Sequence, residues 1–171
     1  MSNLILRKIE RLSPDIAIAT FCAILLLVGF YLEYFENLIP CPLCLIQRLI
    51  YLTILLTSAF SFFLFSVVRY KIYFLCMSAF FSFLGIITAG RQVWLQHLPS
   101  DQVSECGPGI AYLLEVYPFQ KVLELIYRGS RSCAEILWEF LGLSIAGWST
   151  LFFIFLLIYA LASAQRLNTN Q

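Results

Sequence analysis

Charged residues are scarce in this chain. Asp, Glu, Lys and Arg together make up 12% of its 171 residues, whereas soluble domains carry about 25%. Hydrophobic residues make up 61% and aromatic residues 16%. The shortage of charge excludes an ordinary soluble domain, and the formal net charge of +1 argues against a nucleic-acid partner.

Four stretches contain no charged residue at all. They are residues 16–32, 49–68, 72–90 and about 143–164. Each is long enough to cross about 30 Å of hydrocarbon, and a helix satisfies its own backbone hydrogen bonds there. No linker, repeat or low-complexity stretch indicates a second domain. We therefore predict an all-α membrane protein, a single four-transmembrane-helix bundle over residues 1–171.

The first stretch has an alternative interpretation as a cleaved signal peptide, because basic residues precede it. No small-x-small cleavage site follows it, which favours an uncleaved helix. Basic residues also lie between the second and third stretches and in the C-terminal tail. They are Arg7, Lys8, Arg11, Arg69, Lys71 and Arg166. The positive-inside rule therefore places both termini in the cytoplasm. For a bacterial inner (plasma) membrane, which we expect here, the opposite side is the periplasm.

Two segments are then expected on the periplasmic side, at about residues 33–48 and 91–142. Eight of the ten acidic residues lie in them, which agrees with this orientation. The second loop is long and contains a broken apolar stretch from Leu113 to Tyr127, interrupted by Pro118. It is too broken to span, and we predict a short helix on the membrane surface, with ordinary packing against the helix bundle as the alternative.

The six cysteines fall into two groups. Cys22 and Cys76 lie inside apolar runs, where cysteine behaves as a small buried residue. The others are all expected in the oxidising periplasm, where disulfides can form; they are Cys41, Cys44, Cys106 and Cys133. Four cysteines allow three pairings, and the sequence does not choose between them. Two local bridges, 41–44 and 106–133, are the most economical arrangement.

The Cys41-Pro-Leu-Cys44 motif is the strongest candidate for a reactive site. A Cys-x-x-Cys pair cycles between dithiol and disulfide. Pro42 suits the first turn of a helix, so Cys44 is expected near a helix N-terminus, where the helix dipole stabilises a thiolate. Arg48 follows at i+4 and would share a face with Cys44. An arginine so close to hydrocarbon indicates a function, although a snorkelling interface residue is the alternative.

Other electron-carrying groups lack their motifs. Haem attachment needs histidine after the second cysteine, where this chain has Leu45, and no Rossmann glycine pattern for a flavin is present. A zinc site built from the four outer cysteines lacks the usual short spacing between Cys106 and Cys133. We therefore expect no metal, flavin or haem. A bilayer-soluble quinone that reaches Cys44 and Arg48 laterally is the acceptor that the topology permits.

The loop cysteines are expected to be accessible. Glu105-Cys106-Gly107-Pro108-Gly109 is typical of an exposed turn, and the residues before Cys133 also predict flexible surroundings. Such cysteines suit thiol–disulfide exchange with a partner protein better than structural bridging. His97, the single histidine, lies a few residues beyond the third apolar run, where an ordinary solvated residue is equally expected.

Taken together, these motifs resemble the disulfide-bond-formation protein B (DsbB) family. The resemblance rests on Cys41-Pro-Leu-Cys44-Leu-Ile-Gln-Arg48, Cys106-Gly-Pro-Gly, Cys133-Ala-Glu-x-x-Trp138-x-Phe140-Leu-Gly-Leu143 and Trp148. It implies a thiol:quinone oxidoreductase with ubiquinone or menaquinone as acceptor and a DsbA-like periplasmic thiol oxidase as partner.

The resemblance also implies residue roles. Cys106 would exchange with the partner, Cys133 would pair transiently with Cys41, and Cys44 would become a thiolate beside the quinone. Arg48 would support that charge and His97 would lie near the quinone. Gln47 stands where some relatives carry an acidic residue, and no role is transferred to it.

Two other interpretations remain open at this point. A vitamin K epoxide reductase-like protein also pairs a loop dithiol with a membrane Cys-x-x-Cys, but there the motif opens a late helix, whereas here it opens the second. A membrane scaffold or metal-binding protein with structural disulfides would have cysteines inert to a reduced partner and no dependence on Arg48.

Overall fold

The structure is a computed structural model that describes residues 14–36, 40–64, 68–98, 116–118, 120–121, 131–134, 136 and 138–169. Four long helices dominate it: α2 (Pro14–Phe35), α3 (Pro42–Leu64), α4 (Val68–Gln96) and α8 (Ile145–Thr169). Each is long and apolar enough to cross a membrane. The prediction of an all-α protein with four membrane-spanning helices is confirmed.

The helices extend beyond the apolar runs from which they were predicted. α3 begins at Pro42 rather than near Leu49, so Cys44 and Arg48 lie in its first two turns and not in a loop. α4 continues past Gly90 to Gln96. The added turns carry polar side chains, which hydropathy leaves out even though the helix backbone continues through them.

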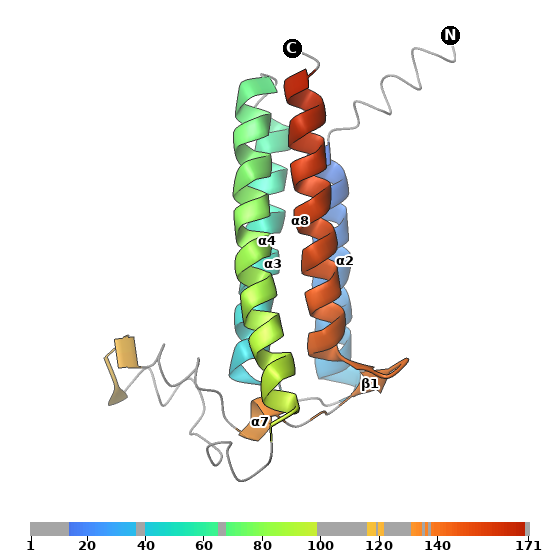
Figure 1. The fold of residues 1–171 in the computed structure, drawn as a ribbon, viewed down its shortest axis with the longest axis vertical. Coiled ribbons are helices and arrows are strands. Elements are labelled where there is room, and N and C mark those ends of the chain that lie inside the picture. The colour runs from blue at the N-terminus through green and yellow to red at the C-terminus, as the bar shows by residue number, and fades with distance from the viewer. Residues whose placement is uncertain are drawn as a thin grey trace.

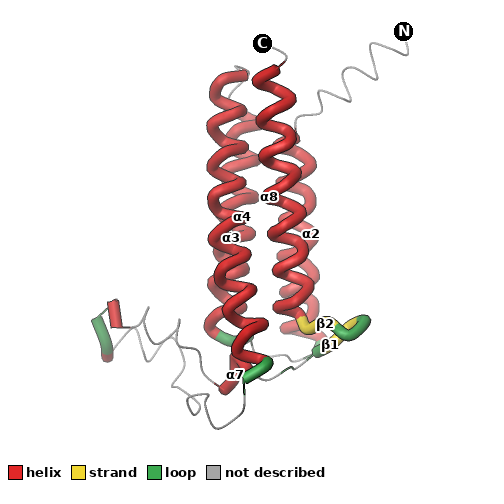
Figure 2. The backbone as a smooth tube through the Cα atoms, viewed as in Figure 1, coloured by secondary structure: helices red, strands yellow, loops and turns green. Residues whose placement is uncertain are grey.

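The four helices form one upright bundle (Figure 1). α4 packs along α8 and α3, while α2 packs along α3. The start of α2 and the end of α8 lie at the same end. Figure 2 shows that the opposite end carries the short helix α7 (Arg131–Ala134) and a hairpin of β1 (Glu139–Phe140) and β2 (Leu143–Ser144).

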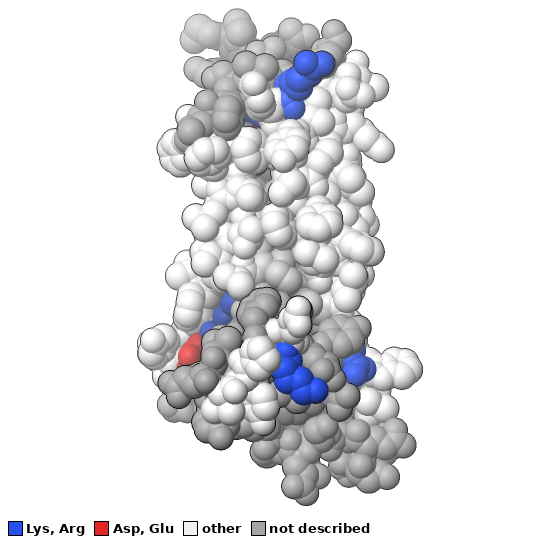
Figure 3. Space-filling view, turned by 90° about the vertical axis from the view of Figure 1, so that its left-hand side faces the viewer, with Lys and Arg blue, Asp and Glu red and all other residues white. Residues whose placement is uncertain are grey.

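Large apolar side chains point outward along the bundle. The exposed fractions of Leu27, Leu56 and Ile158 are 68%, 59% and 61%. Figure 3 shows a broad belt of uncharged side chains, with the charged ones near the two ends. A continuous apolar surface of this kind is unfavourable in water and matches the hydrocarbon of a bilayer. The belt therefore faces lipid.

Inside the bundle, α3, α4 and α8 meet around Phe153. This side chain is fully buried and stacks on the Tyr51 ring, with 4.1 Å between centroids and 6° between planes. The Tyr51 hydroxyl donates a hydrogen bond to the Ser149 carbonyl at 3.2 Å. Gly85 on α4 faces the Phe153 ring, because a Cβ added there would lie 2.6 Å from Cγ of Phe153. The close approach of α4 and α8 therefore requires a residue without a side chain at this position.

The hairpin turns through two residues, Leu141 and Gly142, with Phe140 opposite Leu143. Their φ angles are 54° and 78°, and positive φ at both positions is what a type I′ turn requires. Glycine adopts such a φ freely, whereas Leu141 does so at a cost in backbone strain. The Trp148 indole donates to the Phe140 carbonyl at 3.0 Å and holds the hairpin against α8.

Ser144 joins the hairpin to two helices. Its Oγ accepts a hydrogen bond from the Gly147 amide at 3.2 Å, the geometry of an N-cap for α8. The same hydroxyl donates to Oε1 of Gln96 on α4 at 2.7 Å. One side chain therefore fixes the hairpin against the end of α4.

Candidate active site

The Cys41 and Cys44 thiols lie at the N-terminal end of α3. Pro42 takes the first helical position, where its missing N–H costs no hydrogen bond, and the Cys44 amide donates to Cys41 Sγ at 3.3 Å, as in a helix cap. The predicted position of Cys44 at a helix N-terminus is confirmed. The two sulfur atoms are 2.7 Å apart, and since a disulfide bond is about 2.05 Å long, a small movement would join them.

Cys133 lies beside this pair, although it is distant in sequence. It is fully buried on α7 and packs with Cys41, Leu43 and Leu95. α7 itself packs against α4 and α3. The accessibility predicted for Cys133 is therefore wrong, because α7 places this cysteine in the interior of the site.

Cys41 is the central sulfur of the three. It shares one hydrogen bond with the Cys133 thiol and another with the Cys44 thiol. The hydrogen bond with Cys133, then that with Cys44, and then burial raise the pKa of Cys41 far above its usual range. Cys41 is therefore in contact with a potential exchange partner on either side.

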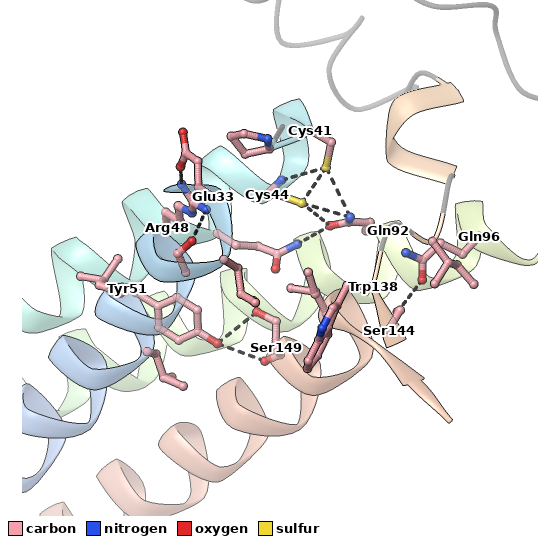
Figure 4. A pocket seen from close by; sticks show the side chains of 18 residues that line it. Glu33, Cys41, Cys44, Arg48, Tyr51, Gln92, Gln96, Trp138, Ser144 and Ser149 are labelled. Carbon is pink, nitrogen blue, oxygen red and sulfur yellow. Dashed lines mark hydrogen bonds and ion pairs between the residues drawn. The ribbon is translucent and has the colours of Figure 1, made fainter. Parts of the chain in front are cut away.

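Gln92 on α4 contacts both sulfurs of the pair (Figure 4). Its Nε2 lies 3.3 Å from Cys41 Sγ and 3.2 Å from Cys44 Sγ. Its Oε1 accepts a hydrogen bond of 2.8 Å from Nε2 of Gln47. Both glutamine side chains are buried. The thiol pair thus adjoins a pair of amide side chains that are themselves hydrogen-bonded.

Arg48 turns toward α2. It forms an ion pair with Glu33, donates to the Gly29 carbonyl at 2.8 Å, and its Cζ lies 5.3 Å from the centroid of the Phe30 ring. Arg48 and Cys44 do line one cavity, as their spacing predicted. Among the residues that the structure describes, however, the guanidinium's hydrogen bonds go to α2 rather than to the Cys44 sulfur.

Glu33→Gln is expected to lower the free energy of unfolding by about 1–3 kcal/mol, because it leaves the Arg48 charge without its carboxylate. For a chain of this size that corresponds to a fall in Tm of roughly 2–10 °C, measured by thermal unfolding in detergent. Glu36→Gln is the matched control, since it removes the same charge from an exposed side chain just beyond α2. Equal Tm values for the two variants would contradict a stabilising Glu33–Arg48 pair.

A cavity of about 130 Å³ adjoins Cys44 and Arg48. Its walls come from the helices α2, α3, α4 and α8 and from the segments that directly precede α3 and α8. Apolar side chains form much of the lining: Leu25, Leu26, Leu32, Ile136, Trp138 and Ile145. Polar side chains gather at the thiol end: Glu33, Gln47, Arg48, Gln92 and Gln96. Such a lining suits a flat, mainly apolar molecule whose polar atoms approach the thiols.

Among the predicted site residues that the structure describes, His97 is not brought into this cluster. His97 is exposed just after α4, its Nδ1 lies 2.8 Å from the Val93 carbonyl, and it is absent from the cavity lining. Cys106 lies outside the described residues, as does most of the surface helix predicted between residues 113 and 127.

Sequence reasoning missed Gln92 and Glu33. Gln92 and Gln96 lie four residues apart just beyond the third apolar run, a spacing that puts both on one helix face at the thiol end. Glu33 directly follows the first apolar run, at the same expected depth as Arg48, and charges at such a depth tend to be paired. Both signals are present in the sequence, but neither shows which side chain Gln92 or Glu33 will contact.

Fold and site together define a class of protein: a multi-pass membrane protein in which one thiol contacts two others at one end of the bundle, with a mainly apolar cavity beside them. Comparison with known proteins names the family. The model for "Disulfide bond formation protein DsbB" matches residues 14–163, and the chain belongs to this family. Membership supports a role in disulfide bond formation as an oxidoreductase of the bacterial membrane.

Relatives named Disulfide bond formation protein B are similar over most of both chains. The protein from Nitrosococcus oceani is 41% identical over 147 residues, which cover 82% of this chain and 83% of the relative. The one from Marinobacter nauticus is 42% identical over 144 residues, with 82% and 83% covered. The one from Hahella chejuensis is 42% identical over 156 residues, with 85% and 90% covered.

Proposed function

We propose that this protein oxidises a DsbA-like periplasmic thiol oxidase by thiol–disulfide exchange and passes the two electrons to a membrane quinone, ubiquinone or menaquinone. The observation that carries the proposal is the contact of Cys41 with both Cys133 and Cys44, beside an apolar cavity with polar groups at its thiol end. The family match supports the disulfide chemistry.

The proposed path has two stages of thiol–disulfide exchange, the first with the partner protein and the second between the two cysteine pairs of this protein. A thiolate of the reduced partner attacks the Cys106–Cys133 disulfide at Cys106, and the partner's second thiolate then resolves the mixed disulfide. The partner leaves oxidised, and Cys106 and Cys133 remain as thiols. The Cys133 thiolate next attacks Cys41 in the Cys41–Cys44 disulfide, so that Cys44 leaves as a thiolate. Attack by Cys106 on Cys133 then restores the 106–133 bridge and leaves Cys41 and Cys44 reduced.

The last step restores the Cys41–Cys44 disulfide. The pair loses two electrons and two protons, and the quinone substrate takes up both and leaves as quinol. Burial of Cys133 beside Cys41 supports direct exchange between these sulfurs, because no large movement of α7 is needed. The mixed lining of the cavity supports binding of a quinone ring with its oxygens toward Cys44 and Arg48.

The charge distribution supports a periplasmic position for the thiols. Arg69 and Lys71 lie at the start of α4 and Arg166 in the last turn of α8, at the end of the bundle away from α7. The positive-inside rule assigns that end, with both termini, to the cytoplasm of a bacterial inner membrane. The thiol cluster would then face the periplasm, where the partner oxidase lies.

Anaerobic turnover tests the whole proposal. Purified protein in detergent is mixed with a reduced DsbA-like protein and a soluble ubiquinone analogue, and in parallel with a menaquinone analogue. One quinone reduced for each partner disulfide formed is the expected result, and the faster analogue identifies the acceptor. An unchanged quinone spectrum with both analogues, together with a partner that stays reduced, would refute it.

Cys106→Ala is expected to stop oxidation of the partner, because the exchange then lacks its first sulfur. Reoxidation of a chemically reduced Cys41–Cys44 pair by quinone should persist, since the pair and the cavity are unchanged. Both reactions can be followed by alkylating the remaining thiols at timed intervals. Partner oxidation at the normal rate in this variant would overturn the assigned path.

A further inference from the structure

Gln92 has the right number of donors for the two sulfurs. A glutamine amide nitrogen carries two N–H groups, and here it lies 3.2 Å from Cys44 Sγ and 3.3 Å from Cys41 Sγ. The side chain is 4% exposed, so water does not readily replace it. One amide can therefore donate to either sulfur without moving.

The orientation of this amide is set by its neighbour. Gln47 Nε2 donates to Gln92 Oε1 at 2.8 Å, inside the protein. That hydrogen bond turns the oxygen of Gln92 toward Gln47, so that the amide nitrogen lies closer to Cys44 Sγ, at 3.2 Å, than the oxygen does, at 3.6 Å. If the amide turned over, two N–H groups would face each other and an oxygen would face the thiols.

Arg48 does not supply these contacts. Its guanidinium is held on α2 by the Glu33 carboxylate and the Gly29 carbonyl. In the reduced pair a thiolate at Cys44 therefore receives hydrogen bonds from the Cys41 thiol and from Gln92, and once Cys41 is bonded to another sulfur Gln92 is the donor that remains. The charge of Arg48 acts on the neighbouring cavity. Hydrogen bonds to an ionised group are stronger than those between neutral groups, so Gln92 favours the thiolate over the thiol.

We propose that Gln92 is a catalytic residue that stabilises the thiolate of the Cys41–Cys44 pair through its amide N–H groups, and that Gln47 is the positioning residue that keeps this amide in the productive orientation. The inference rests on the proposed function and adds two residues to it. When Cys44 leaves the disulfide as a thiolate, an N–H of Gln92 is already beside it. If the negative charge develops on Cys41 instead, the second N–H of Gln92 donates a hydrogen bond to that sulfur.

The test measures the thiols directly and needs no quinone. Full-length protein is fully reduced in detergent, and alkylation of Cys44 by iodoacetamide is followed from pH 5 to pH 10 by mass spectrometry of the Cys44 peptide. Since only the thiolate reacts, the rate at each pH reports the thiolate population. Gln92→Leu removes the donors at similar volume, and Gln92→Glu keeps the shape but offers only oxygens.

Both Gln92 variants are expected to alkylate about tenfold more slowly near neutral pH, with the midpoint of the profile about one pH unit higher. Gln47→Glu is expected to slow the alkylation of Cys44 in the same way, although residue 47 contacts neither sulfur. A carboxylate cannot donate a hydrogen bond to Gln92 Oε1, so the Gln92 amide must turn its oxygen toward the thiols. Adding Gln47→Glu to Gln92→Leu should change nothing further, since both act through one group.

Thr88→Val is the matched control. Thr88 lies one turn before Gln92 on α4, donates to carbonyls of its own helix, and does not line the cavity. Its alkylation profile should equal that of the wild type. A wild-type profile in Gln92→Leu would overturn the inference even if turnover with quinone stands. Slow alkylation in Gln92→Leu with a wild-type profile in Gln47→Glu would overturn the role of Gln47.

Discussion

Replacement of Cys44 by serine is expected to abolish the proposed quinone reduction and to leave the helix bundle folded. Cys44 is the half-buried sulfur that lines the cavity and touches both Cys41 and Gln92. A serine hydroxyl fits the same space but cannot form a disulfide with Cys41. The two electrons then have no path from the thiols to the acceptor.

The measurement is anaerobic quinone reduction with the reduced partner, alongside thermal unfolding of the same samples. Cys76→Ser is the control. The burial expected for Cys76 from its apolar run is wrong, because this side chain is exposed on the lipid-facing surface of α4, and it lies outside the thiol cluster. It should keep the wild-type rate. Quinone reduction at a substantial rate by Cys44→Ser would show that electrons leave from another sulfur, and the proposed last step would fall.

A second large effect is expected at Gly85. A methyl group there would lie 2.6 Å from Cγ of Phe153, a ring that is fully buried and stacked on Tyr51. α4, α8 or the ring must therefore shift. Overpacking of this kind costs about 1–3 kcal/mol, and Gly85→Ala should lower Tm by roughly 2–10 °C.

Gly90→Ala is the control for Gly85→Ala, because it lies on the same helix and a Cβ there meets nothing within 4 Å. An alanine inside a helix is more favourable than glycine by about 0.5–1 kcal/mol, so Tm should stay equal or rise. Equal losses in both variants would mean that the contact with Phe153 is not what requires glycine. Because Tyr51 also lines the cavity, Gly85→Ala should weaken quinone binding as well.

The number and type of the spanning helices could be predicted because the free energy of inserting a segment into a membrane depends mainly on the residues of that segment. About 20 apolar residues without charge are sufficient, whatever they later pack against. Helix ends were less predictable, because α3 and α4 continue through polar residues up to the thiol end. The helical backbone hydrogen bonds of α3 and α4 continue beyond their apolar runs, so hydropathy alone does not mark where these helices begin and end.

The sequence by itself determined the membrane fold, the helix-opening position of Cys44, and the set of residues that could carry redox chemistry. All of these depend on neighbours within one or two helical turns. The partners inside the site were decided by the tertiary structure: Gln92 lies 48 positions from Cys44, Glu33 lies 15 positions from Arg48, and α7 inserts Cys133 beside Cys41. Such contacts depend on how whole helices pack, and no local pattern specifies which of several polar side chains will meet.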